Sequence, residues 1–216
     1  MSHTPYTPIA LTGIHTDVGK TICAAVLVRA LQCDYWKPIQ AGGLDNSDSD
    51  TVRRWNETAH IHPEAYRLQL AASPHTAARA EQVSIALTDL RAPATDRPLL
   101  IETAGGVCSP VNEQHVVADL LAHYHWPTLL VTQHYLGSIS HTLSAIDALN
   151  QRGVAVLGLI VNGNADDASE QFITQYSGLP ILAHIERMTE LSESAMAQQA
   201  QRIAPHLTVL RPYWTS

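Results

Sequence analysis

Residues 13–21 have the composition of a loop that binds phosphate groups. The segment reads Gly-Ile-His-Thr-Asp-Val-Gly-Lys-Thr, and it lies between a short apolar run and a strongly apolar, helix-like stretch. Backbone N–H groups and the dipole at the start of a helix attract anionic oxygens. The Lys20 ammonium could reach the outer phosphates of a nucleotide, and the Thr21 hydroxyl could bind Mg²⁺. This segment therefore predicts a site for a nucleotide and magnesium.

The spacing of this loop differs from the pattern G-x-x-x-x-G-K-[ST]. Five residues separate Gly13 from Gly19, and Ile14 stands where the pattern has glycine. A chance Gly-Lys-Thr at the start of a helix is the alternative interpretation. The order of strand, loop and buried helix favours the phosphate loop.

Carboxylates that could hold magnesium follow two predicted strands. Glu102 stands at the end of an apolar run, before Gly105 and Gly106, and three aspartates follow Lys37 in a polar loop (Asp45, Asp48 and Asp50). Magnesium prefers such oxygen ligands, and ligands of open α/β sheets bind at the carboxyl ends of strands. The alternatives are a surface acid at a strand end and an ordinary solvated loop.

The elements that must position these residues alternate along the chain, which is typical of a doubly wound, mostly parallel α/β sheet with helices on both faces. Strands are predicted at 9–11, 34–37, 99–101, 128–132, 154–162 and 180–185. Helices are predicted at 21–31, 110–124 (with Asn112 as N-cap), 140–151, 170–176 and 190–204. The polar region 44–98 predicts helices with long loops. No linker or repeat divides the chain, so we expect one domain over residues 1–216.

Composition narrows the possible functions. Thirteen basic and twenty acidic residues give a net charge of −7, which argues against nucleic-acid or anionic-membrane partners. Three cysteines without a CxxC pair indicate a reducing compartment. The longest apolar run, 154–161, is too short to cross a bilayer, and the N-terminus has no signal peptide pattern. We therefore expect a cytoplasmic protein.

With these motifs in order, the sequence resembles the ATP-dependent dethiobiotin synthetases, a family with a P-loop NTPase-like fold. The five-residue spacing of the loop is that of the family pattern G-T-D-T-[ED]-V-G-K-T. Further resemblances are Tyr-Trp-Lys-Pro-Ile at 35–39, Asn-Ser-Asp-Ser-Asp at 46–50, Ser-Pro-His at 73–75, Glu-Thr-Ala-Gly-Gly at 102–106, Leu-Gly-Ser-Ile at 136–139 and Asn162.

The resemblance implies a reaction of 7,8-diaminononanoate, CO₂ (or bicarbonate) and ATP that gives dethiobiotin, ADP and phosphate. A carbamate and then a carbamic–phosphoric anhydride would be the intermediates. It also implies Mg²⁺ as cofactor, ATP as co-substrate, and a homodimer whose substrate site lies at the subunit boundary.

The resemblance further assigns roles to individual residues. Lys20 and Lys37 would be the catalytic cations, and Mg²⁺ would be held by Thr21, Asp50 and Glu102, with Asp48 left open as the alternative to Asp50. ATP would be bound by Gly13, Asp17, Val18, Gly19, Lys20, Thr21, Ile22, Asp50, Glu102, Thr103, Ala104, Gly105, Asn162 and Gly163. Substrate would be bound by Thr16, Lys37, Ala41, Ser138, Ile139 and Ser140. The sequence departs from the family at Ala41, at Ser140 and at residues 183–186.

Three other functions remain open from the sequence. A partition or septum-site ATPase switch has a related loop, but it carries a lysine where this chain has His15. The synthetase domain of a cobyrinate-type amide ligase needs an attached glutaminase with a nucleophilic cysteine, and no cysteine follows Thr132. The third is a nucleotide-binding regulator without activity.

Overall fold

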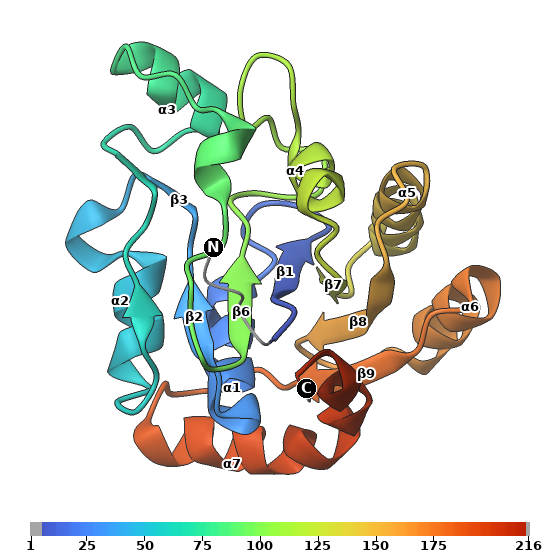
Figure 1. Ribbon diagram of the computed structural model, residues 1–216. Coiled ribbons are helices and arrows are strands. Elements are labelled where there is room, and N and C mark those ends of the chain that lie inside the picture. The colour runs from blue at the N-terminus through green and yellow to red at the C-terminus, as the bar shows by residue number, and fades with distance from the viewer. Residues whose placement is uncertain (1–5, 215–216) are drawn as a thin grey trace.

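A sheet of seven strands lies at the centre of the molecule, in the order β4-β2-β6-β1-β7-β8-β9 (Figure 1). The computed structural model describes residues 6–214. The strands are β1 (Ile9–Gly13), β2 (Asp34–Trp36), β4 (Ile61–His62), β6 (Leu99–Glu102), β7 (Thr128–Thr132), β8 (Val156–Asn162) and β9 (Ile181–Ile185). Every neighbouring pair in this sheet is parallel, so the carboxyl ends of all seven strands meet at one edge. Two more strands, β3 (Ile39–Ala41) and β5 (Tyr66–Leu68), form a separate parallel pair.

Helices cover both faces of the sheet, as the sequence predicts, because each face buries its own apolar cluster. One cluster includes residues of α1 (Lys20–Leu31), α2 (Asp48–Arg54), α7 (Glu193–Ile203) and the 3₁₀ helix η3 (Ala204–Tyr213). The other includes residues of α3 (Pro74–Ala80), α4 (Val117–Tyr124), α5 (Ser138–Asn150) and α6 (Asp167–Ser177). Two short 3₁₀ helices, η1 (Leu44–Asn46) and η2 (Leu87–Leu90), lie in the connections. No helix within residues 6–214 has both the length and the apolar character needed to cross a bilayer.

The turn from β1 into α1 depends on Gly19. Its φ of 88° lies in the left-handed region, which glycine adopts without strain. A Cβ there would lie 2.1 Å from Asn162 Nδ2, so the loop also packs against the end of β8. β1 is wholly buried, and α1 buries residues 23–28, which holds the loop rigidly at the centre of the sheet edge.

The predicted strands and most helices are confirmed within a few residues, but the helix predicted at 110–124 begins too early. α4 starts only at Val117, because residues 110–116 form a turn closed by an antiparallel bridge between Pro110 and Val116. Asn112, the expected N-cap, accepts the N–H groups of Gln114 and His115 inside that turn. The N-cap of α4 is Val116 and not Asn112, and the N–H of Val116 donates to the carboxylate of Asp119.

The last helix also begins later than the predicted residue 190. The Ser192 hydroxyl accepts the N–H of Ala195, which fixes the start of α7 at Glu193. The region 44–98 contains short helices between long loops, as predicted, and adds the small strands β4 and β5.

Candidate active site

A pocket of about 560 Å³ opens at the carboxyl ends of β1, β2 and β6. Its volume lies in the usual range for small-molecule sites. One part of its wall carries the polar side chains of the loops that follow these strands. The rest is apolar and comes from Ile39, Ala41, Ala71, Ala72 and Pro74. The pocket could therefore hold a ligand with an anionic end and an aliphatic body.

Lys20 lies at the start of α1 and lines this pocket, although it is largely buried. Its ammonium donates to the carbonyl oxygen of His15 at 3.4 Å, within the same loop. Burial lowers the pKa of Lys20, and the nearby carboxylate of Glu102 only partly opposes this effect. Among residues 6–214 the amine therefore has no ion-pair partner, as expected for a group that meets an anionic ligand.

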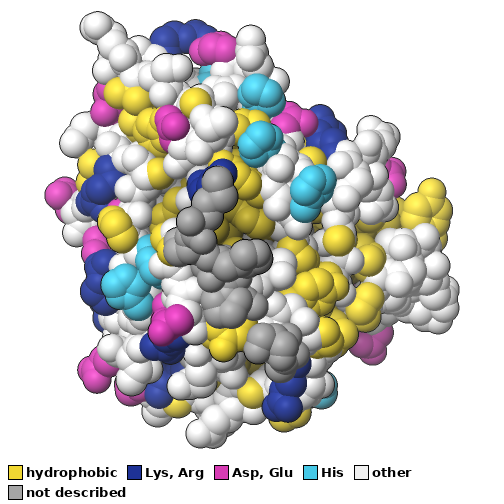
Figure 2. All heavy atoms as spheres, viewed as in Figure 1, with side chains coloured by type: hydrophobic (Ala, Val, Ile, Leu, Met, Phe, Trp, Pro, Cys, Tyr) yellow, Lys and Arg dark blue, Asp and Glu magenta, His cyan; other side chains and the backbone are white. Residues whose placement is uncertain are grey.

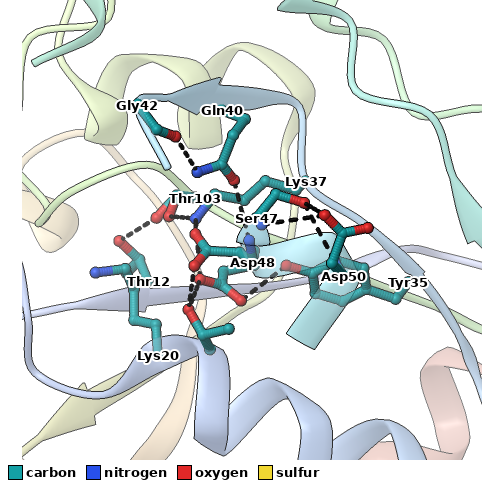
Figure 3. A network of polar contacts seen from close by, with 12 residues as sticks. Thr12, Lys20, Tyr35, Lys37, Gln40, Gly42, Ser47, Asp48, Asp50 and Thr103 are labelled. Carbon is teal, nitrogen blue, oxygen red and sulfur yellow. Dashed lines mark hydrogen bonds and ion pairs between the residues drawn. The ribbon is translucent and has the colours of Figure 1, made fainter. Parts of the chain in front are cut away.

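Lys37 follows β2 and is buried in an ion-pair network (Figure 3). Its Nζ lies 2.9 Å from Glu102 Oε1 and 2.5 Å from Asp48 Oδ2, and it donates to the carbonyl oxygen of Thr103 at 3.3 Å. Burial acts to lower the pKa of Lys37, but the two carboxylates outweigh it and raise the pKa above its ordinary value. Lys37 is therefore a fixed positive charge on the pocket wall.

Three oxygen donors converge beside Lys37. Thr21 Oγ1 lies 2.8 Å from Asp48 Oδ1 and 3.0 Å from Glu102 Oε1. Burial acts against the charge on Asp48, but the ion pair with Lys37 lowers its pKa. A hydroxyl and two carboxylates are hard ligands of the kind that Mg²⁺ prefers, and all three residues line the pocket. These residues fit a magnesium ion.

Asp50 is not brought together with the other predicted magnesium ligands. Its carboxylate accepts hydrogen bonds from the N–H and hydroxyl of Ser47, the N-cap of α2, and pairs with Arg53 at 2.5 Å. These hydrogen bonds from Ser47 lower the pKa of Asp50. Because residues 48 and 50 are two apart on a helix, their side chains face different directions. Asp48 occupies the position beside Thr21 that the sequence assigned to Asp50.

Two buried side chains that the sequence did not single out for roles hold the network together. The Tyr35 hydroxyl donates to Glu102 Oε2 at 2.9 Å, and burial, followed by the Glu102 charge, raises the pKa of this phenol. Gln40 donates to the carbonyl oxygen of Gly42 and accepts the N–H of Asp48. Tyr35 and Lys37 are two residues apart on an extended segment, a spacing that places both side chains on one face. That spacing was the available signal for Tyr35.

The remaining predicted residues divide into two groups. Those that line the pocket are Thr16, Asp17, Gly19, Ala41, Ala104 and Gly105. The pocket lining does not include Gly13, Val18, Ile22, Thr103, Asn162 or Gly163. Two of these hold the loops around it: Asn162 Nδ2 donates to the carbonyl oxygen of Val18 at 2.9 Å, and the Thr103 hydroxyl donates to the side-chain hydroxyl of Thr12 at 2.9 Å.

The three predicted substrate residues on α5 are not brought to this pocket within residues 6–214. Ser138, Ile139 and Ser140 begin α5, after Gly137 with its φ of 98°. Ser138 is buried, whereas Ser140 is exposed, and Leu136 just before the helix is fully exposed. The helix start therefore faces outward from the chain that carries it.

On the face shown in Figure 2, lysine and arginine side chains are interspersed with aspartate and glutamate and do not form one basic patch.

Within residues 6–214, no group of three or more His, Cys, Asp and Glu side chains is arranged to hold a metal ion. The group beside Lys37 consists of two carboxylates, of Asp48 and Glu102, and the hydroxyl of Thr21. It contains neither the thiolate nor the imidazole ligands that zinc sites commonly use.

Comparison with known proteins relates this chain to one enzyme family. A family model described as an AAA domain matches residues 7–195. The chain is 42% identical to the ATP-dependent dethiobiotin synthetase BioD of Cytophaga hutchinsonii over 196 residues, which cover 89% of this chain and 95% of that protein. The protein of the same name from Chlamydia pneumoniae is also 42% identical, over 90% of this chain and 88% of its own length.

Solved structures of similar fold include an ATPase and a cell division protein complex. A ParA family ATPase from Chlorobium tepidum has a TM-score of 0.55 at 14% identity, covering 98% of both chains. A chain of the MinC:MinD cell division protein complex from Aquifex aeolicus has a TM-score of 0.57 at 13% identity, covering 95% of both chains. At these identities the likeness shows a shared P-loop NTPase-like fold and says nothing of activity.

Proposed function

Because the chain belongs to the family of ATP-dependent dethiobiotin synthetases, we propose that it is a ligase of biotin synthesis that closes the ring of dethiobiotin. Its substrates would be 7,8-diaminononanoate, CO₂ or bicarbonate, and ATP. The observation that carries the proposal is the pocket in which Lys20, Lys37 and the carboxylates of Asp48 and Glu102 adjoin an apolar wall.

The reaction needs positioning and charge more than a side-chain nucleophile. A nitrogen of the diamine attacks CO₂ and loses a proton, which gives a carbamate. The carbamate oxygen attacks the γ-phosphorus of ATP and releases ADP, and the resulting anhydride is attacked by the second amine, which closes the cyclic urea and expels phosphate. Both transfers bring anionic oxygens together, so fixed cations should supply much of the acceleration.

The ammonium groups of Lys20 and Lys37 are the cations proposed for these steps. Lys20 extends from the phosphate loop without a close counter-ion, which suits contact with the outer phosphates. Lys37 lines the same pocket, where it would meet the carbamate. The apolar residues Ile39, Ala41 and Ala71 suit the aliphatic chain of the diamine.

Thr21, Asp48 and Glu102 would hold Mg²⁺ in this proposal, with Asp48 in place of Asp50. When bound, the ion would neutralise charge on the β- and γ-phosphates. The loop from Gly13 to Ile22 would bind the phosphates through its backbone, and Asn162 and Gly163 would adjoin the adenine.

We further infer that one ATP-binding synthetase domain spans the chain and acts as a cytoplasmic homodimer. In the dimer, the start of α5 would bind the carboxylate of a substrate held in the partner's pocket. Free N–H groups at a helix start suit an anion, and the exposed Leu136 beside them supports a covered surface. Sedimentation across a range of concentrations tests the association. A monomer with full activity would contradict the shared site.

Phosphate release tests the function directly. The protein is incubated with ATP, Mg²⁺ and ¹³C-bicarbonate, with and without 7,8-diaminononanoate, and the product is examined by mass spectrometry. We expect diamine-dependent phosphate release and a dethiobiotin that carries one ¹³C. Diamine-independent hydrolysis stimulated by DNA or lipid would instead favour a partition-type switch.

A further inference from the structure

Tyr35 is a buried phenol that the proposed reaction does not use. It lies on β2, two residues before Lys37, and its side chain is fully buried. Its hydroxyl donates a buried hydrogen bond to Glu102 Oε2 at 2.9 Å, and Figure 3 shows Tyr35 beside the polar network. The residue contacts the polar network, but it does not line the pocket.

The two carboxylate oxygens of Glu102 have different hydrogen-bond partners. Oε2 accepts from Tyr35, whereas Oε1 accepts from Lys37 Nζ at 2.9 Å and from Thr21 Oγ1 at 3.0 Å. The terminal torsion of a glutamate side chain is broad and prefers no single orientation by itself. A donor fixed on one oxygen therefore determines which oxygen faces the pocket.

The position of this donor is itself fixed by packing. Tyr35 is among the largest fully buried side chains, and β2 is paired on both sides, with β4 and with β6. Glu102 ends β6, so the phenol and the carboxylate lie on neighbouring strands and share one rigid support. The packed sheet therefore fixes the Tyr35 hydroxyl, and its hydrogen bond in turn fixes the orientation of the Glu102 carboxylate.

We propose that Tyr35 is a positioning residue that holds Glu102 so that Oε1 faces the divalent cation. The proposal rests on the proposed function, because it assigns Tyr35 a part in presenting a magnesium ligand. A tyrosine that merely filled the core and satisfied a buried oxygen would affect stability but leave cation binding unchanged. The test must therefore measure cation binding apart from stability and apart from turnover.

The test is the Mn²⁺ affinity of Tyr35→Phe, measured by electron paramagnetic resonance on the full chain with saturating ADP. We expect about tenfold weaker Mn²⁺ binding or more, as is usual when a group that orients a metal ligand is removed. ADP affinity in the presence of EDTA should match that of the unaltered protein. The control is Tyr124→Phe, which removes a phenol that donates to the carbonyl oxygen of Leu87, away from the pocket. It should leave Mn²⁺ affinity unchanged.

A double-mutant cycle separates positioning from a general loss of structure. In a Glu102→Gln background, Tyr35→Phe should cause no further loss of Mn²⁺ affinity, because the group that it positions is gone. An equal loss in both backgrounds, or an unchanged affinity in Tyr35→Phe alone, would overturn the proposal.

A second measurement serves if Tyr35→Phe does not fold. Incorporation of 3-fluorotyrosine at position 35 keeps the ring and hydroxyl, and its ¹⁹F resonance should shift when Mg²⁺ is added with ADP. No shift would overturn the proposal. Neither measurement needs the diamine, so failure of the protein to make dethiobiotin would reject the proposed function without deciding the role of Tyr35.

Discussion

Lys37 Nζ and Glu102 Oε1 lie 2.9 Å apart, so an ammonium that follows β2 is paired with the carboxylate that ends β6. The same Glu102 oxygen accepts the hydroxyl of Thr21, and Asp48 completes the group from α2. One oxygen thus serves both the lysine and the proposed cation position. Because this oxygen is shared, replacing one side chain of the network should change the interactions of the others, and with them turnover or cation affinity.

Replacement of Lys37 by alanine should abolish turnover without preventing nucleotide binding. Lys37 follows β2 and is not part of the phosphate loop, so ATP affinity should stay within severalfold. Loss of a fixed cation at the reacting oxygens should lower the turnover rate by about 100-fold or more. Isothermal titration with a non-hydrolysable ATP analogue and the phosphate-release assay measure the two effects. Normal turnover would show that Lys37 has been given the wrong role.

Removal of the Lys37 charge should strengthen the binding of a divalent cation. The ammonium and the cation use the same carboxylates, and without the lysine the buried Glu102 and the half-buried Asp48 lose the cation that they share. Lys37→Met should therefore bind Mn²⁺ more tightly than the unaltered protein, and added Mg²⁺ should raise its melting temperature more. Removal of the metal with EDTA should reverse that gain.

The control for this charge effect is Arg53→Met, which changes net charge equally at an exposed pair with Asp50. It should leave Mn²⁺ affinity unchanged. Weaker Mn²⁺ binding by Lys37→Met would mean that the lysine supports the cation site and does not compete for it.

Asp48→Asn and Asp50→Asn form a matched pair that tests the magnesium ligand. Asp48 Oδ1 accepts the Thr21 hydroxyl, so Asp48→Asn should weaken Mn²⁺ binding about tenfold or more. Asp50 is the N3 residue of the capping box that begins α2, so Asp50→Asn should lower the free energy of unfolding by about 1 kcal/mol and leave the metal unaffected. Electron paramagnetic resonance and urea unfolding measure the two properties. The reverse pattern would restore Asp50 as the ligand.

Asp119 should make the stability of the fold depend on pH at acid values. Burial acts against its charge, but the Val116 N–H and the Arg152 guanidinium lower the pKa of Asp119 below its ordinary value of 3.8. A carboxyl whose pKa is lower in the folded state stabilises the fold above its unfolded pKa. That stabilisation is lost as the pH falls through the folded pKa.

Asp119→Ala should therefore lower the free energy of unfolding by about 1 kcal/mol at pH 7, and the difference should diminish as the pH falls below the ordinary carboxyl pKa of 3.8. Urea unfolding of both proteins across this range checks the expectation. Asp147→Ala, at an exposed position of α5, should show little difference at either pH. A difference for Asp119→Ala that stays constant with pH would assign its effect to packing.

The sequence predicted the strand and helix order because the apolar periodicity of a buried parallel sheet is local information. It also predicted the loop between β1 and α1, since Gly19, Lys20 and Thr21 follow a strand and begin a helix within a few residues. The predicted start of α4 was wrong because Asn112 suits both a helix cap and a tight turn. Only the bridge between Pro110 and Val116 decides between the two.

The choice between Asp48 and Asp50 depended on the tertiary structure. Both are acidic residues of one polar segment, and they differ only in the direction that α2 gives each side chain once Ser47 caps it. Tyr35 is similar, because its contact with Glu102 joins residues 67 positions apart on strands that are not consecutive in the chain. The sequence by itself determined which chemical groups are present and which strand ends carry them. Only the packing of β2, β6 and α2 decided which oxygens meet, since hydrogen-bond geometry depends on ångström distances that residue types and spacing do not encode.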